Sequence, residues 1–492
     1  MAREGSPISE GVLVPEVDGA RSTSALGRTV VAAALQPVDP VGARGARSET
    51  SWRRAYLVHF RRLVEAGLDS RDAALAIAGG GLDALYAQMR YDTGDGEVAV
   101  GEAASAAFDG EPLGTQTVTG AGEPQRDLVV PYRGKRLAGD DLHRQLDRWV
   151  AGGIVEPTCA EAVRTVMANP DWLDLSDRRT VVLGAGAEMG PLTSLLRWGA
   201  DVVAVDLPRP AIWERVLGTA ARYGGRLHVP VSGPPDDDGD LAKRAGADLV
   251  HDLPRVAAWL RELDGPLVLG NYVYADGAMN LRVSMAVDAL TTSLLEERTD
   301  LALAFLATPT DVFAVPPAAV AEADRRYRDR SGLGRLRRPV RFLSAGRLLS
   351  RNYPPGADPG INDALVAQQG PNYALAKRLQ RWRAAVARAE GTTVSLNVAP
   401  ATRTRSVLRN RVLAAAYAGA HRFGIEVFEP ATSNTMMAAL LVHDLRTGPP
   451  AQEHPWQDEA YAAAHGGLWR AAYSPRSALG LAVFLGFGST RG

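Results

Sequence analysis

From Arg178 onward, short apolar runs alternate with longer amphipathic stretches, and few folds accommodate this alternation. It is typical of β-α-β units, whose strands are parallel and whose helices cover the sheet. We expect strands at Thr180–Leu183, Asp201–Val205, Leu249–His251, Leu267–Leu269, Leu301–Leu306 and Val394–Val398. We expect helices at about 190–199, 210–223, 254–263, 279–297 and 372–389. The pattern therefore predicts an α/β domain with a doubly wound parallel sheet.

The rest of the sequence divides around this domain. Residues 1–50 are rich in Ala, Gly, Ser, Pro and Arg without apolar periodicity, which predicts a disordered tail. Residues 51–175 carry apolar side chains at helical spacing and are predicted to form a helix-rich amino-terminal region. The α/β domain is placed at 176–445, with an insertion at about 311–370, and a carboxy-terminal tail follows at 446–492.

A glycine-rich segment, Gly184-Ala185-Gly186-Ala187-Glu188-Met189-Gly190, follows the first expected strand. Glycines let the backbone turn tightly and approach a pyrophosphate, which the next helix can bind through its free N–H groups. Asp206 ends the second strand at about the 20-residue spacing at which an acid binds ribose hydroxyls. This order predicts a Rossmann-type nucleotide site that uses Gly184, Gly186, Glu188, Met189, Gly190 and Asp206. A strand–helix turn without a ligand is the alternative.

A second motif begins an amphipathic helix, Asn372-Tyr373-Ala374-Leu375-Ala376-Lys377, and is followed by the strand Val394–Val398 and by Ala399-Pro400. Residues four apart share one face of a helix, so Tyr373 and Lys377 can point into one cleft. Lysine occurs only at positions 135, 243 and 377, so its presence here favours a function. The alternative is a packed tyrosine beside a solvated lysine.

These motifs resemble the short-chain dehydrogenase/reductase family, whose Tyr-x-x-x-Lys helix leads to a strand ending in Asn-x-x-Pro-Gly; here Asn397 and Pro400 match. The resemblance covers roughly residues 178–410 and implies NAD(P)-dependent oxidation of an alcohol or reduction of a carbonyl. Tyr373 would then be the acid/base, and Lys377 would lower the pKa of Tyr373 and bind the nicotinamide ribose.

The same resemblance implies three further roles. Asn280 would help to hold a proton-relay water, Asn271 would lie beside the cofactor after the fourth strand, and Asp252 would lie near the adenine. A role as a turn or helix-cap residue is the alternative for each of the three.

The sequence departs from the family pattern in three places. Glu188 stands where the phosphate loop usually has glycine, and Ala401 replaces the glycine after Pro400. The family's catalytic serine has no clear counterpart, because the fifth expected strand ends near Thr308 and Thr310, far before Tyr373. We favour Ser344, which follows an apolar run, and keep Thr308 and Thr310 as alternatives.

Two other functions fit part of the pattern. A methyltransferase that uses S-adenosylmethionine shares the glycine turn and the ribose-binding acid, but it leaves Tyr373 and Lys377 unexplained. A degenerate scaffold would bind a nucleotide without turnover. We favour the oxidoreductase, with NAD slightly preferred over NADP because the Asp206 carboxylate would repel a 2′-phosphate, although Arg209 weakens this preference.

Composition limits the partners. A formal net charge of −1 gives no electrostatic reason to expect nucleic acid, and no apolar run is long enough for a membrane span. The single cysteine, Cys159, cannot form an intramolecular disulfide or a thiolate metal cluster. We therefore expect a cytoplasmic protein with a small-molecule substrate and no metal. The family resemblance adds a possible homo-oligomer.

Overall fold

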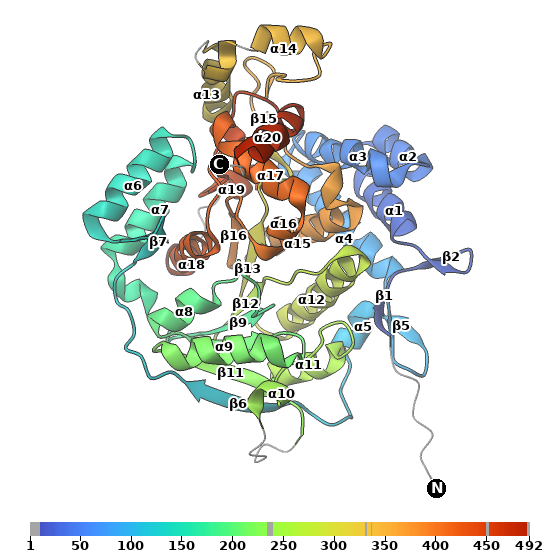
Figure 1. Ribbon diagram of the computed structural model, residues 1–492. Coiled ribbons are helices and arrows are strands. Elements are labelled where there is room, and N and C mark those ends of the chain that lie inside the picture. Colours follow the sequence, from blue (N-terminus) through green and yellow to red (C-terminus); the bar gives the residue numbers. More distant parts are fainter. Residues whose placement is uncertain (1–9, 234–239, 330–331, 336, 449–451, 490–492) are drawn as a thin grey trace.

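A seven-stranded sheet runs through the computed structural model, which describes residues 10–233, 240–329, 332–335, 337–448 and 452–489 (Figure 1). Its strand order is β16-β13-β12-β9-β10-β11-β6. The parallel strands are β9 (Arg179–Leu183), β10 (Asp201–Val205), β11 (Arg226–Val231), β12 (Leu267–Asn271), β13 (Leu301–Ala307) and β16 (Val394–Val398). Taken in chain order, the six parallel strands lie as 3-2-1-4-5-6, which is the dinucleotide-binding order. The predicted Rossmann-type doubly wound sheet is confirmed.

Helices cover both faces of this sheet. Successive strand residues point to opposite faces, so Val181 and Leu183 of β9 pack into one core and Val182 packs into the other. The first core includes α11 (Leu253–Arg261), α12 (Gly277–Glu297) and α15 (Pro371–Ala389). The second includes α8 (Leu192–Trp198), α9 (Pro210–Arg222) and α18 (Pro430–Thr447). Central strands such as β10 and β13 are largely apolar because both of their faces are buried.

The first fifty residues are largely folded, so the prediction of disorder is wrong for residues 10–50; residues 1–9 lie outside the described residues. Helix α1 (Thr23–Leu35) buries Leu26, Val30, Val31 and Leu35 against α4. The many small residues hid this helical period in the sequence. The amino-terminal elements are β1 (Gly11–Leu13), β2 (Glu16–Val17), β3 (Ala20–Arg21), α2 (Pro40–Ser48), α3 (Trp52–Gly67), α4 (Arg71–Gln88), β4 (Arg90–Asp92), β5 (Glu97–Ala99) and α5 (Val100–Ser105).

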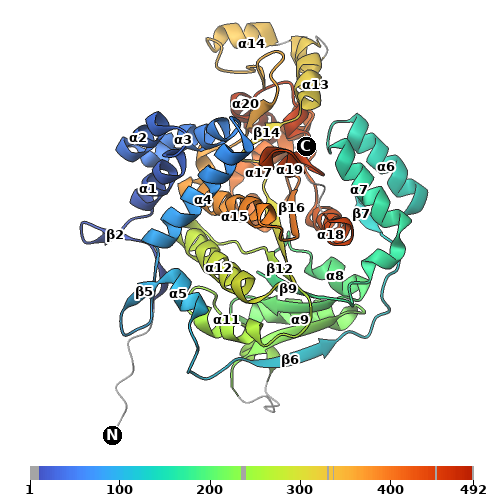
Figure 2. The ribbon, with the colours of Figure 1, turned by 180° about the vertical axis from the view of Figure 1, so that it is seen from behind.

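The third parallel strand is not the expected one. Leu249–His251 forms a turn, and β11 takes the place predicted for it. Pro230, which disfavours a strand in the sequence, lies beyond the residues of β11 that pair with β10. On its other side β11 pairs antiparallel with β6 (Gly114–Thr119), so the 51–175 region completes the main sheet (Figure 2). That region also holds β7 (Val130–Tyr132), β8 (Lys135–Leu137), α6 (Gly139–Ala151) and α7 (Pro157–Ala168).

The expected insertion carries its own small sheet, in which β14 (Val312–Val315) pairs antiparallel with β15 (Gly360–Asp363). Between them lie α13 (Pro317–Arg328) and α14 (Arg337–Leu343), which project at the top of Figure 1. The remaining helices are α10 (Leu241–Arg244), α16 (Arg405–Arg409), α17 (Arg411–Ala420), α19 (Pro455–Ala460) and α20 (Pro475–Ser489). Short 3-10 helices lie at Pro170–Leu173, Gly332–Arg335, Ala367–Gln369, His421–Phe423 and Leu468–Arg470.

The segment expected to be a tail folds back onto the molecule. Helix α20 crosses α17 with almost no space between the backbones. A Cβ added to Gly419 would lie 2.0 Å from the carbonyl oxygen of Ala482, and one added to Gly486 would lie 1.8 Å from that of Ala415. Within the described part of the chain, no helix combines the length and apolar character that a bilayer span requires.

Candidate functional site

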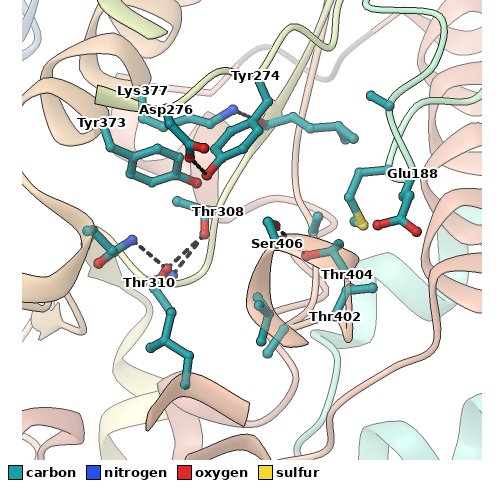
Figure 3. Close-up of a pocket in the computed structure, with 18 of the residues that line it drawn as sticks. Glu188, Tyr274, Asp276, Thr308, Thr310, Tyr373, Lys377, Thr402, Thr404 and Ser406 are labelled. Atoms are coloured by element: carbon teal, nitrogen blue, oxygen red, sulfur yellow. Dashed lines mark hydrogen bonds between the residues drawn. The ribbon is translucent and has the colours of Figure 1, made fainter. Parts of the chain in front are cut away.

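A cavity of about 1260 Å³ opens along the carboxyl edge of the parallel strands. Its walls come from the segments after β9, β10, β12, β13 and β16, from the first turns of α15, and from α17 and α20. Ligands of open α/β sheets bind at this edge, because the loops there surround a crevice. Most of the residues singled out in the sequence line this cavity (Figure 3).

The glycine turn forms one end of the cavity. Gly184 has a positive φ of 84°, and a Cβ there would lie 2.9 Å from the backbone of Tyr272, so both conformation and space require glycine. A Cβ on Gly186 would lie 3.1 Å from the Asp206 carboxylate. A Cβ on Gly190 would make only an ordinary contact at 3.5 Å. Gly184 is therefore fixed by its backbone conformation and by the space around it, Gly186 is crowded only by side chains, and Gly190 is not crowded.

Asp206 lies next to this turn. Its carboxylate accepts hydrogen bonds from the Gly186 N–H at 2.7 Å and from the Leu207 N–H at 2.8 Å. Burial raises the pKa of Asp206, and these two hydrogen bonds oppose the rise. Arg209 and Arg215 line the same end of the cavity, and Arg215 donates to the Gly186 carbonyl oxygen at 3.0 Å. This end of the cavity therefore offers the Asp206 carboxylate and the Arg209 and Arg215 guanidinium groups to a ligand.

Glu188 is paired across the cavity. Its carboxylate lies 3.1 Å from the Arg405 guanidinium and accepts the Arg405 backbone N–H at 2.7 Å. Met189, beside it, also lines the cavity. The pairing offsets the charge that makes Glu188 unusual in a phosphate loop. Sequence reasoning missed Arg405, which is one of many arginines and is brought to the glycine turn only by the fold.

Tyr373 and Lys377 lie on the same side of α15 and line the middle of the cavity. The Tyr373 ring makes an edge contact with Tyr274 at 6.2 Å between centroids. Burial raises the pKa of Tyr373, and a hydrogen bond with Thr308 opposes the rise, so the prediction that Lys377 lowers this pKa is wrong. The Lys377 ammonium donates to the Leu306 carbonyl oxygen at 3.1 Å and to Gln380 at 3.0 Å. Burial lowers the pKa of Lys377 to about 8, although the Asp311 carboxylate opposes this.

The hydroxyls beside Tyr373 come from Thr308 and Thr310 and not from Ser344. The Thr308 and Thr310 hydroxyls lie 2.9 Å apart, and Gln369 donates to Thr310 at 2.9 Å. Ser344 follows α14, where it bonds the Arg341 carbonyl oxygen at 3.3 Å and the Leu348 N–H at 3.1 Å, outside the cavity. The prediction of Ser344 depends on the apolar run before it being a strand. That run belongs to a helix of the insertion.

The remaining predicted residues divide between the cavity and other places. Asn271 ends β12, lines the cavity and accepts from Gln380 at 3.2 Å. Asn280 accepts the Ala275 N–H at 3.0 Å and does not line the cavity, which fits its alternative role in a turn. Asp252 accepts the Asp248 N–H at 2.9 Å and lines a separate smaller cavity. Asp248 itself lines the main cavity, a position that sequence reasoning missed.

Asn397, part of the family resemblance, points away from the cavity. Its amide donates to Asp444 at 2.9 Å and to Ser395 at 3.0 Å in a buried polar cluster. Pro400 and Ala401, just after β16, line the cavity. Among the described residues, no cluster of three His, Cys, Asp or Glu side chains is arranged to hold a metal ion.

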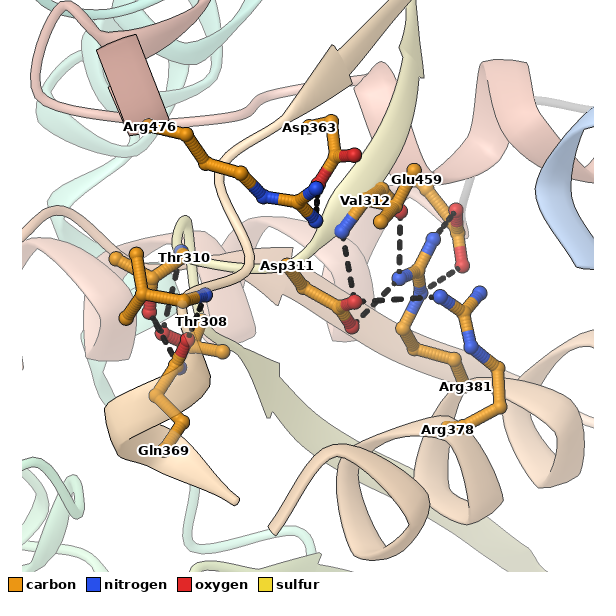
Figure 4. Close-up of polar contacts among 11 residues, drawn as sticks. Thr308, Thr310, Asp311, Val312, Asp363, Gln369, Arg378, Arg381, Glu459 and Arg476 are labelled. Atoms are coloured by element: carbon orange, nitrogen blue, oxygen red, sulfur yellow. Dashed lines mark hydrogen bonds and ion pairs between the residues drawn. The ribbon is translucent and has the colours of Figure 1, made fainter. Parts of the chain in front are cut away.

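A buried ion-pair network holds α15 against the strand that follows Thr310 (Figure 4). Asp311 lies 3.2 Å from Arg378 and 2.8 Å from Arg381, and Arg381 also pairs with Glu459 at 2.5 Å. The side chains of Asp311, Arg378 and Arg381 are almost fully buried. The network therefore fixes the helix that carries Tyr373 and Lys377 relative to the Thr308–Thr310 loop.

The sequence matches no described protein family and no curated protein. Among solved structures it is similar to an A1-type ketoreductase, with a TM-score of 0.31, 14% identity, and coverage of 55% of this chain and 46% of the other. It is also similar to a thiolation-reductase di-domain from an archaeal non-ribosomal peptide synthetase, with a TM-score of 0.27, 11% identity, and coverage of 54% and 52%. The chain thus spans about half the length of each of these structures. TM-scores this low carry no argument about chemistry, so the function is inferred from the residues that line the cavity.

Proposed function

We propose that this protein is a nicotinamide-dependent oxidoreductase that interconverts a carbonyl compound and an alcohol. One observation carries the proposal: a single cavity contains the glycine turn with Asp206 at one end and Tyr373, Lys377 and Thr308 in its middle. The cavity volume of about 1260 Å³ exceeds the roughly 300–1,000 Å³ typical of a site for one small ligand. A dinucleotide and a substrate therefore have room in it together.

The residues of the turn fit a dinucleotide. Gly184 and Gly186 line the cavity without side chains, and Arg405 and Arg215 offer cations for a pyrophosphate. The Asp206 carboxylate retains acceptor capacity for ribose hydroxyls beside its two backbone bonds. The segment 247–250, which includes Asp248, is suited to the adenine. NAD remains slightly preferred, because Asp206 would repel a 2′-phosphate.

The chain's own residues can supply the proton. A bound nicotinamide supplies or accepts the hydride. In the reductive direction Tyr373, whose raised pKa keeps it protonated at neutral pH, donates its phenolic proton to the carbonyl oxygen. Thr308 and Thr310 hold that oxygen through their hydroxyls. The Lys377 ammonium, largely charged at pH 7, stabilises the phenolate that remains.

Calorimetric titration of the purified protein with NADH, NADPH and S-adenosylmethionine tests the first step. We expect a nicotinamide dinucleotide to bind and S-adenosylmethionine not to bind. Selective binding of S-adenosylmethionine would indicate a methyltransferase, and binding of none of the three would leave the glycine turn structural.

Turnover tests the second step. Tyr373→Phe is expected to lower kcat for carbonyl reduction by about 10²–10⁴-fold without changing the dinucleotide Kd, because only proton transfer is lost. Tyr461→Phe, outside the cavity, is the matched control and is expected to retain activity. Tight dinucleotide binding without turnover of any carbonyl compound by the unmodified protein would identify a scaffold.

A further inference from the structure

The cavity extends beyond Tyr373 into a part whose lining has a different composition. There its walls come from α17, α20 and the segments 423–427 and 468–475. Among the described residues, every charged side chain that lines the cavity precedes Asn410 in the chain, and the lining from Leu413 onward has none. We name this part the apolar arm. Its larger members include Leu413, Tyr417, Phe423 and Tyr473.

Tyr373 lies where the two parts of the cavity meet. Its ring contacts Tyr274, which belongs to the loop after β12 and so to the nucleotide end. It also lies close enough to Tyr417 of α17, in the apolar arm, for the two phenols to interact electrostatically. A group held at Tyr373 therefore has the nucleotide end on one side and the apolar arm on the other.

The apolar arm owes its space to small side chains. Ala416 and Ala420 on α17, and Ala478 and Ala482 on α20, all line it. The two helices are closely packed, because Gly419 and Gly486 allow their backbones to come into direct contact. The arm is therefore a built space between closely packed helices. One larger side chain on its wall would reduce it.

We propose that the substrate carries a long unbranched apolar chain that lies in the apolar arm, with its carbonyl or hydroxyl group at Tyr373. This rests on the proposed oxidoreductase function. Each buried methylene stabilises the complex enough to raise affinity about fourfold. An ionic group in the arm would lose its water without meeting a charged side chain of the described lining, which disfavours charged substrate tails there.

The experiment compares straight-chain aldehydes from propanal to dodecanal with the full-length protein and the dinucleotide that it binds. We expect kcat/KM to rise by up to about fourfold per methylene until the arm is filled. Ala416→Trp should reduce kcat/KM for dodecanal to about that for propanal. Ala414→Trp, on the same helix but outside the cavity lining, is the matched control and should keep the chain-length dependence. Equal kcat/KM for all aldehydes with the unmodified protein would overturn the proposal.

Direct binding separates this proposal from the proposed function. Calorimetry with dodecanol measures occupation of the arm without turnover, and thermal melting followed by circular dichroism checks that each variant is folded. Suppose that no aldehyde is reduced, and that dodecanol binds the unmodified protein but does not bind a folded Ala416→Trp variant. The proposed chain site is then supported, and the proposed oxidoreductase function is wrong. If Ala416→Trp does not fold, Ala482→Leu takes its place. Failure of dodecanol to bind the unmodified protein would overturn the proposed chain site.

Discussion

Removal of the charge on Asp311 is expected to destabilise the protein strongly. The Asp311 side chain is 2% exposed, and its partners Arg378 and Arg381 are 6% and 3% exposed. Breaking a buried ion pair typically costs about 3–5 kcal/mol, because a charge is left buried without its partner. In Asp311→Asn, Arg381 keeps the Glu459 carboxylate, whereas Arg378 has no other ion-pair partner among the described residues. We therefore expect a loss at the lower end, about 3 kcal/mol.

Urea denaturation of Asp311→Asn and of the unmodified protein measures this loss. The control is Asp141→Asn, whose exposed pair with Arg144 should contribute less than about 1 kcal/mol. Adding Arg378→Met to Asp311→Asn should recover part of the loss, because it removes the unpaired guanidinium. A loss below about 1 kcal/mol for Asp311→Asn would refute the reasoning.

The ion pairs of Asp311 also predict how the stability of the protein depends on pH. Burial by itself raises the pKa of Asp311, but Arg378 and Arg381 outweigh it, and the pKa in the folded protein is lowered. A carboxyl with a lowered pKa contributes its stability above its unfolded pKa of about 3.9 and loses it as the pH falls through the folded value. The stability difference between the unmodified protein and Asp311→Asn should therefore persist from pH 5 to 8 and shrink below about pH 4.

Three further outcomes are expected. Glu188→Gln should lower the Kd for NADH about fivefold, because it removes a negative charge and frees Arg405. Calorimetry measures this Kd, and weaker binding would contradict the assignment of the pyrophosphate to this end of the cavity. Because burial lowers the pKa of Lys377 to about 8, kcat/KM for carbonyl reduction should decline as the pH rises through that value. Lys377→Arg should move the decline to higher pH, and a decline at the same pH would implicate another group. Gly184→Ala should lower the free energy of unfolding by about 1–3 kcal/mol, because φ is 84° and the backbone of Tyr272 would lie 2.9 Å from the new Cβ. Thermal melting checks this, and an unchanged melting temperature would contradict the geometry.

Local patterns in the sequence determined most of the sheet and part of the site. Five of the six expected strands are strands in the structure, because a strand buried on both faces is largely apolar, as residues 202–205 of β10 are. The glycine turn was readable because Gly184 needs a conformation that other residues avoid. Tyr373 and Lys377 were brought together by the helical period alone.

Tertiary structure decided the rest, since contacts between distant segments leave no periodic signal in a single sequence. The edge strand β6 comes from a Thr-rich segment that the sequence leaves open between loop and short strand, and its pairing with β11 is set by the fold. Helix α1 packs against α4 and α2, and these contacts come from segments that follow it in the chain. The Glu188–Arg405 pair joins positions far apart in the chain, and the apolar arm depends on α20, which was expected to be part of a tail. Short-range spacing thus specified the elements and the glycine turn, whereas long-range packing specified which side chains share the cavity.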